Sequence, residues 1–273
     1  MIVRTWACFM TATIVAGTFV WGCGDNPESP SLDQIVVRGY LFAGEPVRDV
    51  QLTASVLIGA SDTTGPPISD ASVTLQRNGV SYILKSDKSR SGYYVYQGND
   101  LFVTSGDRFH FEAVRGEVHV TASTTVPTKP QALKVSRDTL VVHVRTIFGN
   151  FQQVYSDDSL VVRWDGSDNE LYYTVMTNIE STPQRILGDS LPAFGFMSQP
   201  TSQLQYSVPA QNIKYVGRYI VRVYKVNQEY ADLYRSRQQD TRSLNEPLTN
   251  VLNGLGVFSA FACDSVAVYI RLK

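Results

Sequence analysis

The side chains best suited to chemistry in this sequence lie within one short segment. It holds two imidazoles and two carboxylates: His110, Glu112, Glu117 and His119. If Arg115-Gly116 forms a two-residue hairpin loop, Glu112 lies opposite His119 and all four side chains share one face. Imidazole and carboxylate groups are common ligands of zinc, so this face is a candidate metal site.

The same segment has a simpler interpretation as an amphipathic hairpin. The residues between the polar ones are apolar: Phe109, Phe111, Ala113, Val118 and Val120. The polar face is then the solvated side of a half-buried hairpin, and opposed Glu and His side chains stabilise it without metal. We favour this interpretation. With this interpretation the sequence contains no catalytic residue that we can assign. We expect no cofactor either, apart from a covalent lipid that is described below.

Acidic residues cluster at two further places, Asp157-Asp158 and residues 165–170. Hard cations such as Ca²⁺ prefer clustered oxygen ligands. The spacing does not fit an EF-hand loop, however, and polar turns between strands have the same composition. We therefore expect turns at both places.

Aromatic residues form the third kind of candidate site. The apolar but loop-like segment 188–197 contains Phe194 and Phe196, which would anchor a partner or ligand if exposed. The alternative is that this loop folds over the core. Tyr94 and Tyr96 alternate on one strand face, where they would stack on a sugar or pack into the core.

The common catalytic motifs are absent from the sequence. It has no phosphate-binding glycine loop, no His-Glu-x-x-His pair and no Gly-x-Ser-x-Gly turn. The chain has only three histidines, and its 24 basic side chains nearly balance its 25 acidic ones. This balance is not typical of nucleic-acid binding. We expect a non-enzymatic protein without a nucleic-acid partner.

The N-terminus predicts export followed by lipid attachment. Arg4 precedes an apolar run, Trp6 to Val20, that is short for a membrane span and leads into polar sequence. Gly22-Cys23 then resembles the end of the lipobox of bacterial lipoproteins. We assign residues 1–22 to a signal peptide and Cys23 to lipidation, with an ordinary cleaved signal peptide as the alternative.

The lipid would anchor the protein to a membrane, and residues 23–33 would form its polar, proline-containing tether. We expect the outer membrane, on either its periplasmic or its cell-surface face. Of the remaining cysteines, Cys8 leaves with the signal peptide and Cys263 stands alone. We expect Cys263 to be a buried small apolar residue, so no disulfide framework forms.

Beyond the tether, short β-strands are predicted almost throughout. Asn78-Gly79 is the strongest hairpin signal. In its register Val73 faces Leu84 and Leu75 faces Tyr82, and we place these pairs in the core. Residues 34–126 should form a sandwich of about seven strands resembling transthyretin-like modules, and the two prolines of residues 127–138 mark a linker.

Residues 139–273 predict a second sandwich that resembles a fibronectin type III domain with a C-terminal extension. Trp164 is expected in its core, and Tyr219 at the tyrosine corner. We leave the structure of residues 235–253 open, although Ser243-Leu244-Asn245-Glu246 could begin a short helix. The predicted fold class is therefore all-β, with two β-sandwich domains.

Several segments together resemble one family of Bacteroidota envelope lipoproteins, domain of unknown function 4249. They are Val37–Leu41, Val50–Thr53, Ile68–Leu75, Thr124–Pro127, and Asn250 with Asn253–Phe258. The resemblance implies a lipidated two-part β protein, often encoded beside a TonB-dependent outer-membrane transporter, without an established activity. Gly254-Leu255-Gly256 should let the last strand approach the core closely.

These observations favour one function and leave two others open. The first is an accessory role, in nutrient uptake, to a TonB-dependent transporter. The second is a surface module that binds glycan or peptide through Phe194, Phe196, Tyr94 and Tyr96. The third is a metal-dependent hydrolase at the hairpin that contains His110 and His119.

Overall fold

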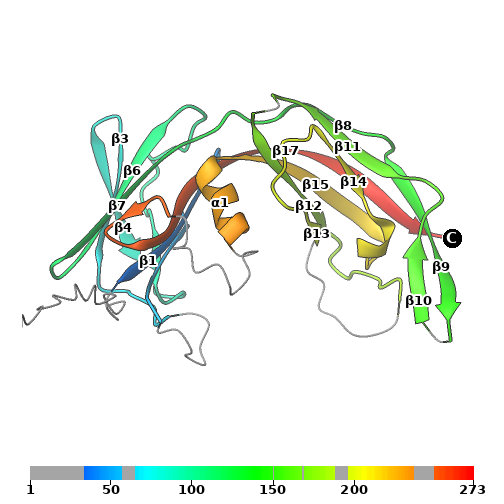
Figure 1. Ribbon diagram of the computed structural model, residues 1–273, viewed down its shortest axis with the longest axis horizontal. Helices are drawn as coiled ribbons and strands as arrows, with labels where there is room; N and C mark the ends of the chain where they lie inside the picture. The colour runs from blue at the N-terminus through cyan, green and yellow to red at the C-terminus, as the bar shows by residue number, and fades with distance from the viewer. Residues whose placement is uncertain (1–33, 57–64, 150, 168, 188–195, 237–248) are drawn as a thin grey trace, which may run out of the picture. The chain divides into compact units, whose positions relative to one another are not determined.

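The computed structural model describes residues 34–56, 65–149, 151–167, 169–187, 196–236 and 249–273 (Figure 1). They belong to one compact unit, Ser31–Lys273. This described part contains seventeen strands, one 3-10 helix and one α-helix, so the protein is all-β as predicted. The signal peptide, Cys23, the whole of the tether, Phe194 and the helix start predicted at Ser243 lie outside the described residues.

Seven strands form between residues 35 and 125, the number expected there. They are β1 (Ile35–Phe42), β2 (Asp49–Ala54), β3 (Ser72–Arg77), β4 (Val80–Ser86), β5 (Tyr93–Val95), β6 (Arg108–Arg115) and β7 (Val118–Thr125). They pair in the order β1-β2-β5-β4-β3-β6-β7. Their alternating apolar side chains enclose a buried cluster, which we call the first core.

The β3–β4 hairpin has the predicted register. Arg77 pairs with Val80 around the two-residue loop, whose residues Asn78 and Gly79 have φ values of 51° and 79°. Positive φ at both positions is what a type I′ turn requires, and Asn-Gly accepts it best. The pairs Val73–Leu84 and Leu75–Tyr82 are buried in the first core, which confirms their predicted place.

The β6–β7 hairpin turns one residue later than predicted. Arg115 pairs with Val118, so the loop is Gly116-Glu117 and His119 lies opposite Val114 rather than Glu112. Gly116 has a φ of 58°. A type II′ turn needs glycine at its first loop position, whereas the predicted loop put it at the second. The apolar face of this hairpin is nevertheless the predicted one, with Phe109, Phe111, Ala113 and Val120 fully buried.

The remaining strands build a second core, except that β16 (Val251–Leu252) pairs with β7 and places Val251 in the first core. They are β8 (Gln131–Val135), β9 (Thr139–Phe148), β10 (Phe151–Tyr155), β11 (Leu160–Asp165), β12 (Leu171–Asn178), β13 (Phe196–Met197), β14 (Gln205–Val208), β15 (Gly217–Val226), β16 (Val251–Leu252) and β17 (Leu255–Leu272). β8, β11 and β14 form a separate three-stranded sheet, while β13, β12, β15 and β17 follow one another in the larger sheet. Trp164 on β11 is 3% exposed within the second core, as predicted.

The last strand, β17, joins both cores and can be followed in red in Figure 1. Its first part pairs in parallel with β1, and its second part pairs antiparallel with β15 and parallel with β9. Phe258 therefore lies in the first core and Ile270 in the second. Phe258 lies within residues 139–273, which the sequence assigns to the second sandwich. The structure differs because one strand of 18 residues, roughly 60 Å at about 3.3 Å per residue, is long enough to serve both sheets.

One short helix, α1 (Gln228–Ser236), follows β15 directly and was not predicted. It covers a small aromatic cluster on the larger sheet, where the Tyr230 ring meets the Phe261 ring edge-on at 4.8 Å. Nine residues carry too little periodicity to be distinguished from a strand-rich background. Among the described residues no helix has the length and apolar character needed to cross a bilayer.

Candidate functional site

The structure does not assemble the metal site considered in the β6–β7 hairpin. His119 Nε2 lies 2.9 Å from Glu112 Oε1, but the ring of His110 hydrogen-bonds Ser123 at 3.0 Å and Glu117 lies in the loop. Nowhere in the described ranges do three or more His, Cys, Asp or Glu side chains come together as ligands for a metal. The one-residue difference in the turn accounts for this, because it moves His119 two positions along its partner strand.

The acidic segments form ion pairs at turns. Asp158 contacts Arg137 Nη1 at 2.5 Å, and Asp157 contacts His143 Nε2 at 3.5 Å. Glu170 accepts hydrogen bonds from the ammonium group of Lys225 and from the Tyr172 hydroxyl. Asp158 and Glu170 therefore have cationic partners within the protein and Asp157 lies beside an imidazole, which fits the predicted turns.

The two alternating tyrosines occupy different environments. Tyr94 is 1% exposed and its hydroxyl accepts the backbone N–H of Ala71 at 3.0 Å, so of the two alternatives it packs into the core and is not accessible as a ligand contact. Burial raises the pKa of its hydroxyl. Tyr96 is half-buried and donates to Asp100 at 2.5 Å, at the edge of an open cleft of about 920 Å³.

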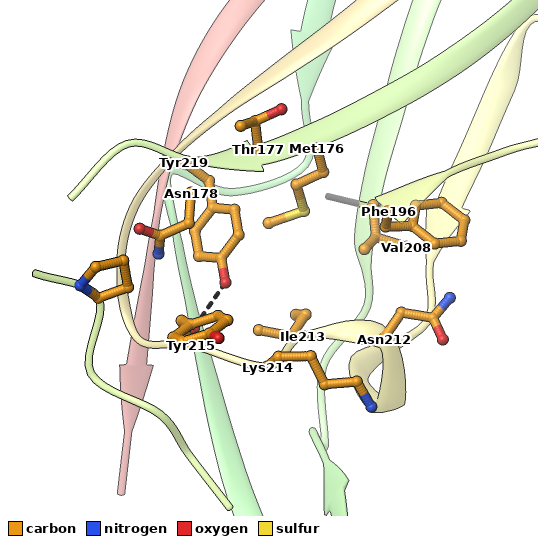
Figure 2. A pocket seen from close by; sticks show the side chains of 11 residues that line it. Met176, Thr177, Asn178, Phe196, Val208, Asn212, Ile213, Lys214, Tyr215 and Tyr219 are labelled. Atoms are coloured by element: carbon orange, nitrogen blue, oxygen red, sulfur yellow. Dashed lines mark hydrogen bonds between the residues drawn. The ribbon is translucent and has the colours of Figure 1, made fainter. Parts of the chain in front are cut away.

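A smaller and better-enclosed pocket lies beside Phe196 in the second part of the chain (Figure 2). Its volume is about 160 Å³. The Phe196 side chain is half-buried and stacks on Tyr206 with ring centroids 5.4 Å apart. The pocket is lined by Met176, Thr177, Asn178, Pro183, Phe196, Val208, Asn212, Ile213, Lys214, Tyr215 and Tyr219. We call it the Phe196 pocket.

Two segments of the chain build most of this pocket. The end of β12 supplies one wall, with Met176 buried at 2% exposure. The other wall runs from Val208 at the end of β14 through the 3-10 helix η1 (Ala210–Asn212) to the start of β15. Pro209 precedes η1 with a φ of −70°, the value that its ring imposes, so the helical turn begins without strain.

Backbone hydrogen bonds hold the floor of the pocket. Ile186 N donates to Lys214 O and Val216 N donates to Gln184 O, each at 3.0 Å. This short ladder fixes the backbone on both sides of Tyr215. Its hydrogen bonds were not predicted, because the sequence near residue 185 has no strand signature.

The predicted tyrosine corner is present at the same place. The Tyr219 hydroxyl donates to the carbonyl of Tyr215 at 2.9 Å, as the dashed line in Figure 2 shows. This is the return to the backbone a few residues upstream that the motif requires. Burial raises the pKa of Tyr219, so its hydroxyl stays protonated and able to donate.

A second side chain braces the wall beside the corner. Asn178 accepts the N–H of Glu180 at 2.9 Å and donates to Val216 O at 3.1 Å. Both ends of its amide are therefore committed to the protein. The tyrosine corner and this amide pre-form the pocket, which supplies apolar contact inside and polar groups at its rim, the usual composition of a ligand-binding site.

The fold and this pocket define an all-β protein of packed sheets with a small, largely apolar pocket in its second part. The chain belongs to the family described as domain of unknown function (DUF4249), which matches residues 25–266. The search of curated proteins gave no match.

Two solved structures resemble the chain weakly. Domains A168–A170 from titin are 12% identical, with a TM-score of 0.21 over 87% of this chain and 66% of theirs. CBD12 from CALX1.2 is 10% identical, with a TM-score of 0.18 over 85% of this chain and 100% of its own.

Proposed function

We propose that this is a non-enzymatic protein, anchored to the outer membrane by a lipid on Cys23, that assists a TonB-dependent transporter in nutrient uptake. The N-terminal export pattern supports the anchor, and the lipoprotein character and Bacteroidota context are part of the same proposal. The link to a transporter comes from the gene neighbourhood that the family resemblance implies, which is an association and not a physical argument.

The structural observation that supports a partner contact is a pair of exposed apolar side chains on the β9–β10 hairpin. Ile147 is 51% exposed and Phe151 is 67% exposed, and they lie on either side of the same turn. Fully burying one such side chain gains about 1.5–3 kcal/mol. Two large apolar side chains on a hydrogen-bonded hairpin are therefore suitable anchors for a protein partner.

The proposal is tested by purifying the full-length acylated protein from its native membrane in mild detergent. We expect a TonB-dependent transporter in near-equal amount, and we expect Ile147→Ser with Phe151→Ser to reduce that amount at least tenfold. Val80→Ser with Ile83→Ser is the matched control, because these two side chains on β4 are 53% and 56% exposed but lie elsewhere. Recovery of the wild-type protein alone would contradict the proposal, as would equal losses from both variants.

The alternative function is a surface module that binds glycan or peptide. One observation favours it, the open cleft beside Tyr96, whose lining also includes Phe102, Arg48 and Arg90. Aromatic and arginine side chains are common at such contacts. Hits on a glycan array or peptide library that disappear in Tyr96→Ala or Phe196→Ala would support this function.

We further propose that the two cores correspond to the two predicted modules. The seven strands β1–β7 support a transthyretin-like first module. The buried Trp164 and the Tyr219 corner support a fibronectin type III-like second module. In this proposal β17 is shared between the modules.

A further inference from the structure

The size of the Phe196 pocket limits what it can hold. Its volume is about 160 Å³. An apolar cavity of about 150 Å³ is large enough for one benzene molecule. The pocket therefore fits a single six-membered ring or a side chain of that size.

The interior of the pocket favours an aromatic ring over an aliphatic group. Figure 2 shows the thioether of Met176 directed into the pocket, with the rings of Tyr215 and Tyr219 beside it. All three side chains are at least nine-tenths buried, so their positions are fixed by packing. Sulfur–aromatic and ring–ring contacts each add to the stabilisation from burial alone.

One cationic side chain, Lys214, lines the pocket, and a second, Arg185, lies close to the lining residue Tyr215. Lys214 is exposed and its ammonium group donates to Gln211 O at 3.1 Å. Arg185 is also exposed, with Cζ 5.8 Å from the centre of the Tyr215 ring. Among the ion pairs of the described residues, neither cation has a carboxylate partner. The nearby Glu180 is paired with Arg218 at 3.1 Å.

We propose that the Phe196 pocket binds a ligand with one aromatic ring and a carboxylate. The ring lies between Met176 and the two tyrosines, and the carboxylate faces Lys214 at the rim. Arg185, whose guanidinium lies near the Tyr215 ring, adds positive potential. The ligand is either a free aromatic acid or the C-terminal aromatic residue of a peptide, since both present the same two groups. This proposal does not depend on a transporter partner.

The chain contains its own reporter for this pocket. It has four methionines, and of these Met176 lines the pocket while Met197 on β13 is 46% exposed outside the lining. The experiment is ¹³C-methyl NMR of the full-length protein labelled at methionine, with Met176→Leu and Met197→Leu used for assignment. The probes are phenylacetate and its neutral analogue phenylacetamide.

We expect phenylacetate to shift the Met176 methyl signal upfield in a saturable manner, because the ring lies against it, and to leave Met197 nearly unchanged. Phenylacetamide should bind about 5–10-fold more weakly. Lys214→Gln should remove this preference for the acid, and it is safe for folding because the side chain is exposed. Lys134→Gln on β8, also exposed, is the matched control and should keep the preference.

A second comparison separates the two sources of the ligand. N-acetylphenylalanine represents a peptide C-terminus, and tighter binding of it than of phenylacetate would assign the pocket to peptides. The reverse order would assign it to free aromatic acids. Two results would overturn the proposal: a Met176 signal that no probe shifts, or equal binding of the acid and the amide to the wild-type protein.

Discussion

The side-chain amide of Asn250 hydrogen-bonds both backbone groups of Phe258. Its Oδ1 accepts from Phe258 N at 3.0 Å, and its Nδ2 donates to Phe258 O at 2.7 Å. β17 pairs with β1 along its opposite edge here, so Asn250 takes the place of a neighbouring strand. Nδ2 also donates to Ser123 O on β7 at 3.2 Å. This one amide therefore ties the last strand to the first core.

Replacing Asn250 with Asp should destabilise the protein. Asp keeps an acceptor for Phe258 N but loses the donor, and it places a carboxylate oxygen beside two carbonyl oxygens. We expect a loss of about 1–3 kcal/mol in the free energy of unfolding, measured by urea titration. Asn99→Asp, at an exposed loop position, is the control. A change no larger than that of the control would mean that Asn250 does not hold β17.

Gly39 on β1 should be intolerant of a side chain. A Cβ at this position would lie 2.5 Å from Cδ2 of Phe258, its partner across the parallel pair. We expect Gly39→Ala to cost about 1–3 kcal/mol through overpacking. Combining it with Phe258→Leu should cost less than the sum of the two single changes, because the smaller side chain leaves room for the methyl group. Additive costs in chemical unfolding would show that the two residues do not interact.

The Tyr219 corner should contribute measurably to stability. Tyr219 is 6% exposed, and Tyr219→Phe leaves the Tyr215 carbonyl without its hydroxyl partner. We expect a loss of about 1–2 kcal/mol, which for a chain of this size lowers Tm by a few degrees, at about 2–4 °C per kcal/mol. Tyr269→Phe on β17, where the side chain is 45% exposed, is the control and should leave Tm unchanged.

Local signals account for the parts of the fold that the sequence predicts. Asn78-Gly79 defines its own turn, and the register of the neighbouring pairs follows from it. The position of Tyr219 in its strand likewise indicated the corner. The β6–β7 turn was placed one residue early because Arg115-Gly116 and Gly116-Glu117 are both acceptable two-residue loops. Only the requirement for glycine at the first loop position separates them.

The path of β17 could not be predicted, because its partners are distant in the sequence. Phe258 pairs with Gly39, more than 200 residues away, and its apolar surroundings resemble those of any buried strand. The glycine-rich block Gly254-Leu255-Gly256, which precedes Phe258, did indicate that the last strand approaches the core closely. A Cβ on Gly256, which has a φ of 102°, would lie 2.0 Å from Val37 O.

The pocket was only partly predictable for a related reason. Phe196 was recognised because apolar residues are unusual in a loop-like segment. Met176 and Tyr215 carry no such signal, since each follows the pattern of an ordinary core residue. The β12–β15 pairing and the ladder between residues 184–186 and 214–216 bring these walls together, and both pairings are set by tertiary structure.

Glu170 should make stability depend on pH in the acidic range. Hydrogen bonds from Lys225 and then from Tyr172 lower the pKa of this carboxyl below its usual value of 4.5. A lowered pKa in the folded state means that the ionised carboxylate stabilises the protein above pH 4.5, and that this contribution is lost as the pH falls through the lowered pKa.

Glu170→Gln removes the titrating group and should therefore flatten the fall in urea midpoint as the pH drops below 4.5. At pH 7 the variant should be less stable than the wild type, because the charge pair with Lys225 is gone. At the acidic end of the range the difference in stability between the variant and the wild type should shrink. Glu117→Gln, at an exposed position in the β6–β7 loop, should keep the wild-type profile. A constant difference at every pH would show that Glu170 contributes by packing and not by its charge.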